Sequence, residues 1–202
     1  MPESQQMSRE QLKRLAVARK RPTAEMLGKL EPNSIRTLLD YFWQHQDENI
    51  LATASRERAE RGLGNENDAY FNGNYAQVEL QRSSGNTDQP SRMSYISSNS
   101  PEVTQKIEEL IGPFYRARLS ALKPGGVIPK HLDDPGDNRV LCILYGKQEF
   151  LIWDKEKREL EMGLGELWFV NTTWEHQVTN PTNSVRVALL LNMFEYPNTK
   201  NV

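Results

Sequence analysis

Apolar residues recur at two different periods along the chain, one in its first third and the other in its last half. Before residue 46 the spacing predicts three helices: one that begins at Ser8, one over residues 23–30 that ends before Pro32, and one that begins at Ser34. The third is the most amphipathic of them, with an apolar face formed by Ile35, Leu38, Leu39 and Phe42. The first third is therefore expected to be helical.

From about Tyr70 onward the apolar period changes to two, which is typical of strands. Strands are predicted over residues 71–80, 93–96, 114–122, 127–131, 139–145, 148–153, 166–170, 174–179 and 185–193. One helix interrupts them over residues 101–111, with Ser100 as its N-cap, Pro101 at its first position and Gly112 beyond its end. Closely spaced strands with polar turns predict a sandwich or barrel with helices packed outside it.

The length and charge of the chain narrow its class. A chain of 202 residues has the size of one compact domain, in which residues 1–69 are expected to form a helical region that packs on a core of residues 70–202. The net charge of -2 provides no positive field for nucleic acid or an anionic membrane surface, so neither is expected as a partner. No apolar run approaches the roughly 20 residues needed to span a bilayer. No apolar leader follows Met1, so a cytoplasmic protein is expected, and its oligomeric state is left open.

The chain has one cysteine and three histidines, which limits the metal sites it can form. Cys142 alone excludes an intramolecular disulfide and a thiolate zinc cluster, and its apolar strand predicts that it packs as a small hydrophobe. His45 and His131 are each followed two positions later by an aspartate, Asp47 and Asp133. In a helix, residues two apart point about 200° apart, so His45 is not expected to bind a metal with Asp47.

His131 lies at the end of a predicted strand, where residues two apart project to the same face. Together with Asp133 it can therefore grip one ion, and His176 can supply a third ligand from another strand. Two imidazoles and one carboxylate form the facial triad of iron(II) oxygenases, which leaves positions open for a co-substrate and dioxygen. On the histidines alone, ordinary surface or hydrogen-bonded strand histidines fit the sequence equally well.

Arg186 gives a further indication of a ligand site, because it lies in an otherwise very apolar strand. A guanidinium that alternates inward with Ala188 and Leu190 is costly to bury without a partner, and a bound dicarboxylate would pair with it. The alternative is an arginine at the rim of the barrel, with its aliphatic stem on apolar surface.

The stretch from Arg118 to Glu195 carries a joint pattern in the segments RLSALKPGGVIPKHLDD, NRVLCIL and GELWFVNTTWEHQVTNPTNSVRVALLL. This pattern resembles the aspartyl/asparaginyl β-hydroxylase family of iron(II)- and 2-oxoglutarate-dependent oxygenases, which includes bacterial free-proline hydroxylases. The resemblance implies a mainly β fold: a jelly-roll or cupin-like double-stranded β-helix with peripheral helices. A carboxylate at the position of Asp133 is found in many bacterial relatives and is lacking in the animal peptide hydroxylases. A histidine that those hydroxylases carry on the NRVLCIL strand is replaced here by Leu141 or Ile143.

The resemblance also implies the roles of particular residues. His131, Asp133 and His176 would bind iron(II), and Arg186 would bind the distal carboxylate of 2-oxoglutarate. Ser120 matches a serine that assists co-substrate binding. Two arginines that match basic positions of the family are assigned less sharply: Arg118 to a carboxylate of co-substrate or substrate, and Arg139 to substrate or to a solvent-facing edge. Apart from the resemblance, Arg82, Arg92 and Arg116 could each bind a free α-carboxylate of the substrate or be surface charges.

The function that follows is an iron(II)- and 2-oxoglutarate-dependent dioxygenase. It would use dioxygen to hydroxylate an amino-acid side chain, free or within a peptide, and release succinate and carbon dioxide. Two other classes remain open: a cupin-like protein that binds a metal or small ligand without turnover, and a metal-free barrel that serves as an interaction module. Iron binding would separate the metal-free module from the other two classes. Succinate formation would separate the dioxygenase from the cupin-like binding protein.

Overall fold

The computed structural model describes residues 8–46, 75–83, 95–98, 101–133, 138–193 and 196. Its helices are α1 (Arg9–Ala18), α2 (Pro32–His45) and α4 (Pro101–Ile111). Its strands are β1 (Ala24–Lys29), β2 (Tyr75–Glu79), β3 (Gln81–Ser83), β4 (Tyr95–Ser98), β5 (Phe114–Leu122), β6 (Val127–His131), β7 (Asn138–Tyr145), β8 (Glu149–Trp153), β9 (Lys157–Glu159), β10 (Glu166–Val170), β11 (Glu175–Thr179) and β12 (Arg186–Met193). The boundary predicted between residues 69 and 70 and the N-cap predicted at Ser100 lie outside the described residues.

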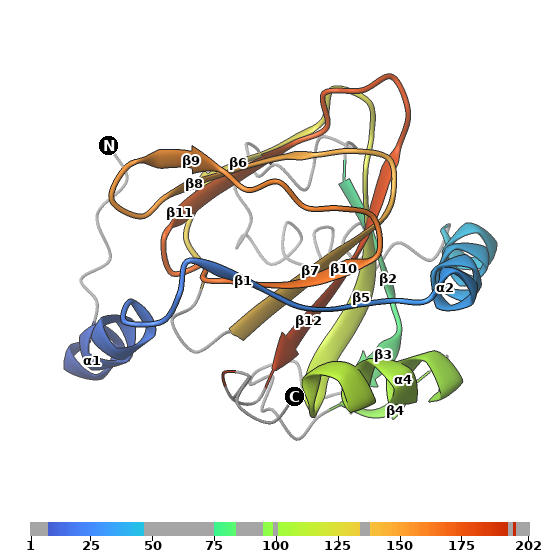
Figure 1. The fold of residues 1–202 in the computed structure, drawn as a ribbon, viewed down its shortest axis with the longest axis horizontal. Helices are drawn as coiled ribbons and strands as arrows, with labels where there is room; N and C mark the ends of the chain where they lie inside the picture. Colours follow the sequence, from blue (N-terminus) through green and yellow to red (C-terminus); the bar gives the residue numbers. More distant parts are fainter. Residues whose placement is uncertain are drawn as a thin grey trace, which may run out of the picture.

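Two antiparallel sheets face each other and form the core of the molecule (Figure 1). One has six strands in the order β1-β10-β7-β12-β5-β2, and the other has four in the order β6-β11-β8-β9. Apolar side chains from both sheets fill part of the space between them, among them Leu122, Leu141, Phe150, Ile152 and Val178. The prediction of a mainly β, cupin-like double-stranded β-helix is confirmed.

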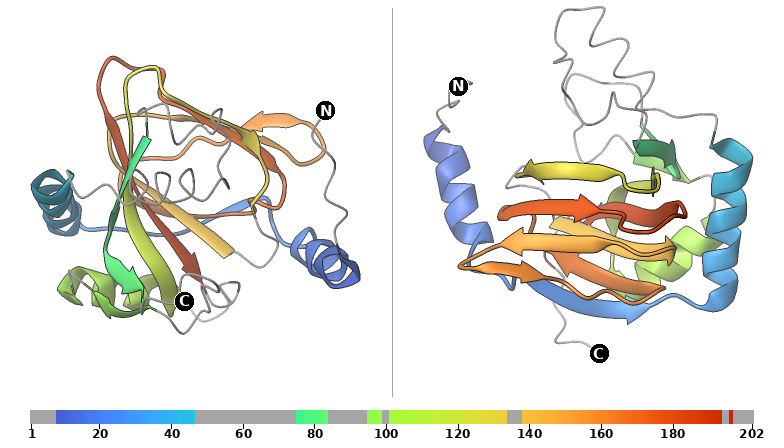
Figure 2. Two further views of the ribbon diagram at one scale, coloured as in Figure 1. Left: turned by 180° about the vertical axis from the view of Figure 1, so that it is seen from behind. Right: turned by 90° about the horizontal axis from the view of Figure 1, so that it is seen from above.

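Helices α2 and α4 cover the outer face of the six-stranded sheet, where Leu38, Phe42 and Ile107 are buried against it. Their partners are outward-facing residues of the central strands, including Leu119, Val140, Cys142, Leu144, Val187 and Leu189. Because β5, β7 and β12 are covered on both faces, their sequences read as nearly continuous apolar runs. Figure 2 shows α1 and α2 on opposite sides of the sheets.

The prediction of a helix over residues 23–30 is wrong, since this segment forms strand β1 at the edge of the six-stranded sheet. Its residues Ala24, Glu25, Met26 and Leu27 all favour helices locally. The free edge of β10 supplies backbone partners instead, and a register shift between Met26 and Gly28 adapts the strand to that edge. Tertiary pairing therefore overrides the local preference.

Helix α2 begins at Pro32, two residues before the predicted start at Ser34. Pro32 does not end a preceding helix, because it occupies a first-turn position of α2, where its missing N–H costs nothing. Ser34 lies inside the helix and is buried.

The other predicted elements are confirmed within a few residues where they fall in the described ranges, including the helix over residues 101–111. Its end at Gly112 has a φ of 83°, a left-handed conformation that favours glycine after a helix. The short strands β3 and β9 were not predicted. None of the described helices has the length and apolar content required to cross a membrane.

Candidate functional site

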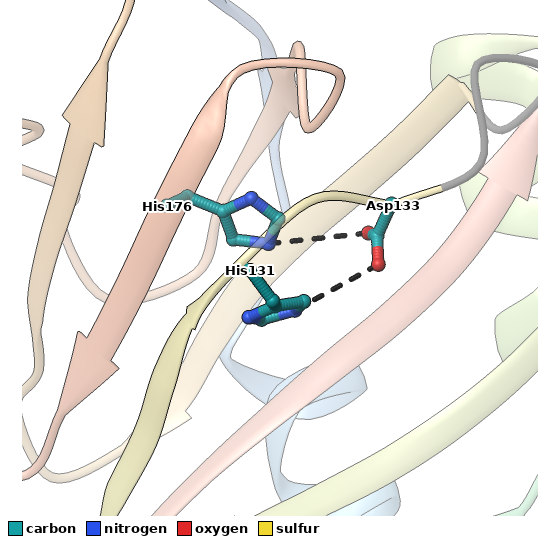
Figure 3. A group of neighbouring side chains, drawn as sticks. All are labelled: His131, Asp133 and His176. Atoms are coloured by element: carbon teal, nitrogen blue, oxygen red, sulfur yellow. Dashed lines mark ion pairs between the residues drawn. The ribbon is translucent and has the colours of Figure 1, made fainter. Parts of the chain in front are cut away.

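Three potential metal ligands converge where β6, β11 and the segment after β6 meet (Figure 3). His131 ends β6 and pairs directly with His176 of β11, because a bulge between His176 and Val178 shifts the register of the two strands. Asp133 follows two positions after His131, and its backbone N–H donates to the carbonyl of Thr172 at 3.0 Å. The three ligand atoms lie within 4.8 Å of one another. The structure therefore brings together the three residues that the sequence predicted as ligands.

Both imidazoles have their Nδ1 atoms engaged by the backbone. Nδ1 of His131 lies 2.7 Å from the carbonyl oxygen of Pro129, and Nδ1 of His176 lies 3.1 Å from that of Trp174. A carbonyl can only accept, so each neutral ring carries its proton on Nδ1 and presents the lone pair of Nε2. These Nε2 atoms lie 3.8 Å and 4.0 Å from the carboxylate oxygens of Asp133. The tautomers are those that a metal requires.

The surroundings of Asp133 and His176 favour the metal-binding protonation states of these two ligands. Burial acts to raise the pKa of Asp133, but the charge of Arg139 and the two imidazoles outweigh it and lower that pKa to about 2. Nη2 of Arg139 donates to Oδ2 of Asp133 at 2.8 Å. Burial, followed by the neighbouring His131, lowers the pKa of His176 to about 4. At neutral pH the set is therefore one carboxylate and a neutral His176.

The donor chemistry fits a divalent transition metal. Two imidazole nitrogens and one carboxylate, from the end of β6 and from the neighbouring strand β11, form the ligand set of iron(II) facial triads. The carbonyls on both Nδ1 atoms and the guanidinium on the carboxylate are the outer contacts that orient metal ligands. His131, Asp133 and His176 can accordingly hold such an ion.

A buried arginine forms a second feature of the interior. Arg186, at the start of β12, is 2% exposed. Its Nη1 donates to Oγ of Ser120 at 3.0 Å, and its Nε donates to Oε1 of Gln148 at 2.8 Å. Its Nη2 donates to the same oxygen of Gln148. Burial lowers the pKa of this guanidinium to about 10, and no ion pair with a carboxylate forms among the described residues.

Arg118 is a second buried cation, two residues before Ser120 on the same face of β5. Its Nη1 donates to the carbonyl of Arg116 at 3.1 Å, while its Nε has no hydrogen-bond partner in the described part of the chain. Burial, followed by the charges of Arg139 and Arg116, lowers the pKa of Arg118 to about 9. Arg116 is half-buried and adopts a φ of 56°, in the region where β5 and β12 shift register.

The seven residues that the resemblance assigns to the site line one cavity of about 80 Å³, which has room for several water molecules. They are Arg118, Ser120, His131, Asp133, Arg139, His176 and Arg186. Arg116 is not among the lining residues, and the Arg82 side chain and Arg92 lie outside the described part of the chain. The structure adds lining residues that sequence reasoning missed: Tyr75, Gln77, Ile128, Leu141, Phe150, Thr172, Val178 and Leu190. Polar positions that alternate with apolar ones mark Tyr75 and Gln77 of β2 as candidates. They reach the cavity because β2 pairs with β5, and nothing in the sequence predicts that pairing.

Two residues that were predicted to lie outside the site do so. His45 ends α2, where its ring stacks on Tyr41 at 4.1 Å between centroids. Cys142 faces the helices rather than the cavity, and burial raises the pKa of its thiol to about 12.

Comparison with known proteins gives one match over most of the chain. The family model for aspartyl/asparaginyl beta-hydroxylase matches residues 43–195, which include the triad and Arg186. This match begins well before Arg118, where the motifs identified in the sequence begin. None of the curated proteins compared matches the chain.

Solved structures provide similar proteins at low identity. An oxidoreductase of the 2OG-Fe(II) oxygenase family from Burkholderia pseudomallei is 13% identical with a TM-score of 0.43, and 62% of this chain and 70% of that chain are covered. A predicted oxalate decarboxylase from Thermotoga maritima is 14% identical with a TM-score of 0.37, covering 59% and 79%. A cupin domain from Bordetella pertussis is 16% identical with a TM-score of 0.33, covering 40% and 81%.

Proposed function

The chain belongs to the aspartyl/asparaginyl β-hydroxylase family, and from this premise we propose that it is an iron(II)- and 2-oxoglutarate-dependent dioxygenase. Family membership supports an oxygenase that hydroxylates its substrate. The observation that carries the finer proposal is the shared cavity, which joins a two-histidine, one-carboxylate set to a buried arginine that has only neutral partners among the described residues. The proposed substrate is an amino-acid side chain, free or within a peptide.

The triad would hold iron(II) through Nε2 of His131, Nε2 of His176 and the carboxylate of Asp133. When bound, this ion supplies the chemistry by which 2-oxoglutarate and dioxygen yield succinate, carbon dioxide and a hydroxylated substrate. Arg139 keeps the Asp133 carboxylate ionised and fixes one of its oxygens. The carbonyls of Pro129 and Trp174 fix both rings. The protein thus maintains a ligand set that needs no proton release at Asp133.

Arg186 would bind the distal carboxylate of 2-oxoglutarate. Its guanidinium is already held by Ser120 and Gln148, so a carboxylate meets an oriented cation rather than a mobile one. A carboxylate would also compensate the buried positive charge of Arg186, which has no carboxylate partner among the described residues. Apolar Phe150, Val178 and Leu190 line the remaining wall and limit the access of water.

Arg118 and Arg139 would act on the substrate or on the second carboxylate of the co-substrate. Both line the cavity and interact electrostatically with Asp133, which supports a role near the proposed metal. Arg118 has a donor, Nε, without a described partner, so an anionic group there gains a charge-assisted hydrogen bond. A substrate with a carboxylate would satisfy this donor.

The test is a product search with the iron-loaded protein, 2-oxoglutarate and air. Free amino acids, their C-terminal amides and short peptides are supplied in separate pools, and mass spectrometry detects the gain of one oxygen atom. We expect a hydroxylated product in the free amino-acid pool or in the peptide pool. If a free amino acid is hydroxylated and its C-terminal amide is not, the protein recognises a free carboxylate.

His176→Ala serves as the inactive variant and His45→Ala as the matched control, because His45 lies outside the cavity. Iron binding without succinate formation in any pool would contradict the proposed dioxygenase activity. It would favour a protein that binds a metal or small ligand without turnover. Equal iron content in the His176 variant and the wild type would contradict the proposed ligand set.

A further inference from the structure

Gln148 lies in the connection between β7 and β8, and its side chain reaches from a surface hollow to the buried anion site. In the hollow it lies beside Met162, Gly163 and Leu164. Its Oε1 atom contacts the guanidinium of Arg186. The residue thus separates the surface hollow from the group that we propose binds 2-oxoglutarate.

The amide of Gln148 has one orientation that satisfies its neighbours. Oε1 accepts from both Nε and Nη2 of Arg186, the first at 2.8 Å. Nε2 points the other way and donates to the Sδ atom of Met162 at 3.5 Å. An arginine has no acceptor, so the oxygen of the amide must face it. With Ser120 on Nη1, these contacts fix the plane of the guanidinium.

The backbone is shaped to place Gln148 there. Gly146, two residues earlier, has a φ of 77° and lies against the start of β12. A Cβ atom at Gly146 would come within 2.7 Å of the Val185 carbonyl oxygen and 3.1 Å of the Arg186 Cα. Glycine therefore permits the turn to approach β12 closely enough for the Gln148 side chain to reach Arg186.

The important property of Gln148 is that it is neutral. Glutamate has nearly the same shape and would accept the same two hydrogen bonds, but it would also pair its charge with Arg186. An arginine that is already ion-paired attracts a ligand carboxylate much less strongly. A glutamine orients the guanidinium and leaves its positive charge for the ligand.

We propose that Gln148 is a positioning residue that sets the anion affinity of this cavity by holding Arg186 without neutralising it. The proposal rests on the proposed function, in that 2-oxoglutarate is the anion. It assigns to the β7–β8 connection a role in co-substrate selection that the triad and Arg186 do not supply themselves.

The test compares Gln148→Glu with Gln148→Leu by two measurements. The first is the dissociation constant of 2-oxoglutarate, titrated calorimetrically into protein loaded with redox-inactive Zn²⁺. The second is the melting temperature of the metal-free protein. Gln148→Glu should weaken 2-oxoglutarate binding at least tenfold and raise the melting temperature, because the buried charge gains a partner. Gln148→Leu should lower the melting temperature and weaken binding less than the glutamate variant.

Gln177→Glu is the matched control. Gln177 of β11 is half-buried, its side chain donates a hydrogen bond to Thr179, and it does not line the cavity. It should leave affinity and melting temperature near their wild-type values. The proposal is overturned if Gln148→Glu binds 2-oxoglutarate within twofold of the wild type, or if affinity and stability fall together in both variants. A wild type that binds no 2-oxoglutarate would contradict the proposed function instead. The melting temperatures would then still decide whether Gln148 leaves Arg186 uncompensated.

Discussion

Replacing Arg186 by methionine should separate ligand affinity from stability. The side chain is buried with one hydroxyl and one amide oxygen as its acceptors, so its charge is poorly compensated without a ligand. Burial lowers the pKa of this guanidinium from its ordinary value to about 10. This corresponds to a free energy on the order of 3 kcal/mol that an anion can recover. A carboxylate that recovers it binds about 100-fold more tightly.

We therefore expect Arg186→Met to weaken 2-oxoglutarate binding by about 100-fold. The free energy of unfolding of the metal-free protein should change much less, by under about 2 kcal/mol, because relief of the buried charge offsets the hydrogen bonds lost at Ser120 and Gln148. Anaerobic calorimetric titration of the iron-loaded protein measures the affinity, and urea unfolding measures the stability.

Arg14→Met is the matched control, because the Arg14 side chain is 61% exposed on α1. It should leave both quantities unchanged. An affinity within threefold of the wild type in Arg186→Met would contradict this role of Arg186, since another group would then bind the distal carboxylate. A collapse of stability with intact affinity would show that Arg186 serves the fold alone.

Three further predictions follow from burial and backbone geometry. Cys142, whose thiol pKa is raised to about 12 by burial, should resist alkylation at pH 8 in the folded protein and react on denaturation; rapid labelling of native protein would contradict its packing. Gly146→Ala should lower the free energy of unfolding, measured in urea, more than Gly125→Ala does. Both glycines have a positive φ, which costs an alanine about 1–2 kcal/mol, but only at Gly146 would the added Cβ also clash with backbone atoms. Equal losses in the two variants would argue against that clash. His176 is buried with its pKa lowered to about 4, so the unfolded state binds its proton first, and the metal-free protein should lose stability as the pH falls from about 6.5 to 4. His176→Asn should flatten that pH dependence, and an unchanged slope would assign it to another group.

Much of the architecture follows from local pattern, because alternation and turn residues mark strands without reference to their partners. Helix α4 and the strands from β5 to β12, except β9, follow this logic. Strand β1 does not, since its residues favour a helix and only the unpaired edge of β10 makes it extended. Short β9 carries three exposed charged residues, Lys157–Glu159, so no apolar alternation marks it as a strand.

The candidate site likewise contains residues that the sequence identifies and one, Gln148, that it does not. His131, His176 and Arg186 are polar residues in predicted strands, and Asp133 follows His131 by two positions. Together with the family resemblance, this pattern predicts a metal and an anion. Gln148 lies in a turn in which a polar residue is ordinary, so nothing local distinguishes it. Its importance comes from the approach of the β7–β8 connection to β12, which depends on the pairing of β12 with β7 and on the closeness that Gly146 permits.

The most direct test of the proposed oxygenase is the fate of dioxygen. Iron-loaded protein is incubated with 2-oxoglutarate and ¹⁸O₂, with and without the amino-acid pools, and the succinate is analysed by mass spectrometry. We expect iron-dependent succinate that carries one labelled oxygen atom, and its loss in the His176→Ala variant. Succinate no more abundant than with free iron in buffer, or succinate without label, would contradict it.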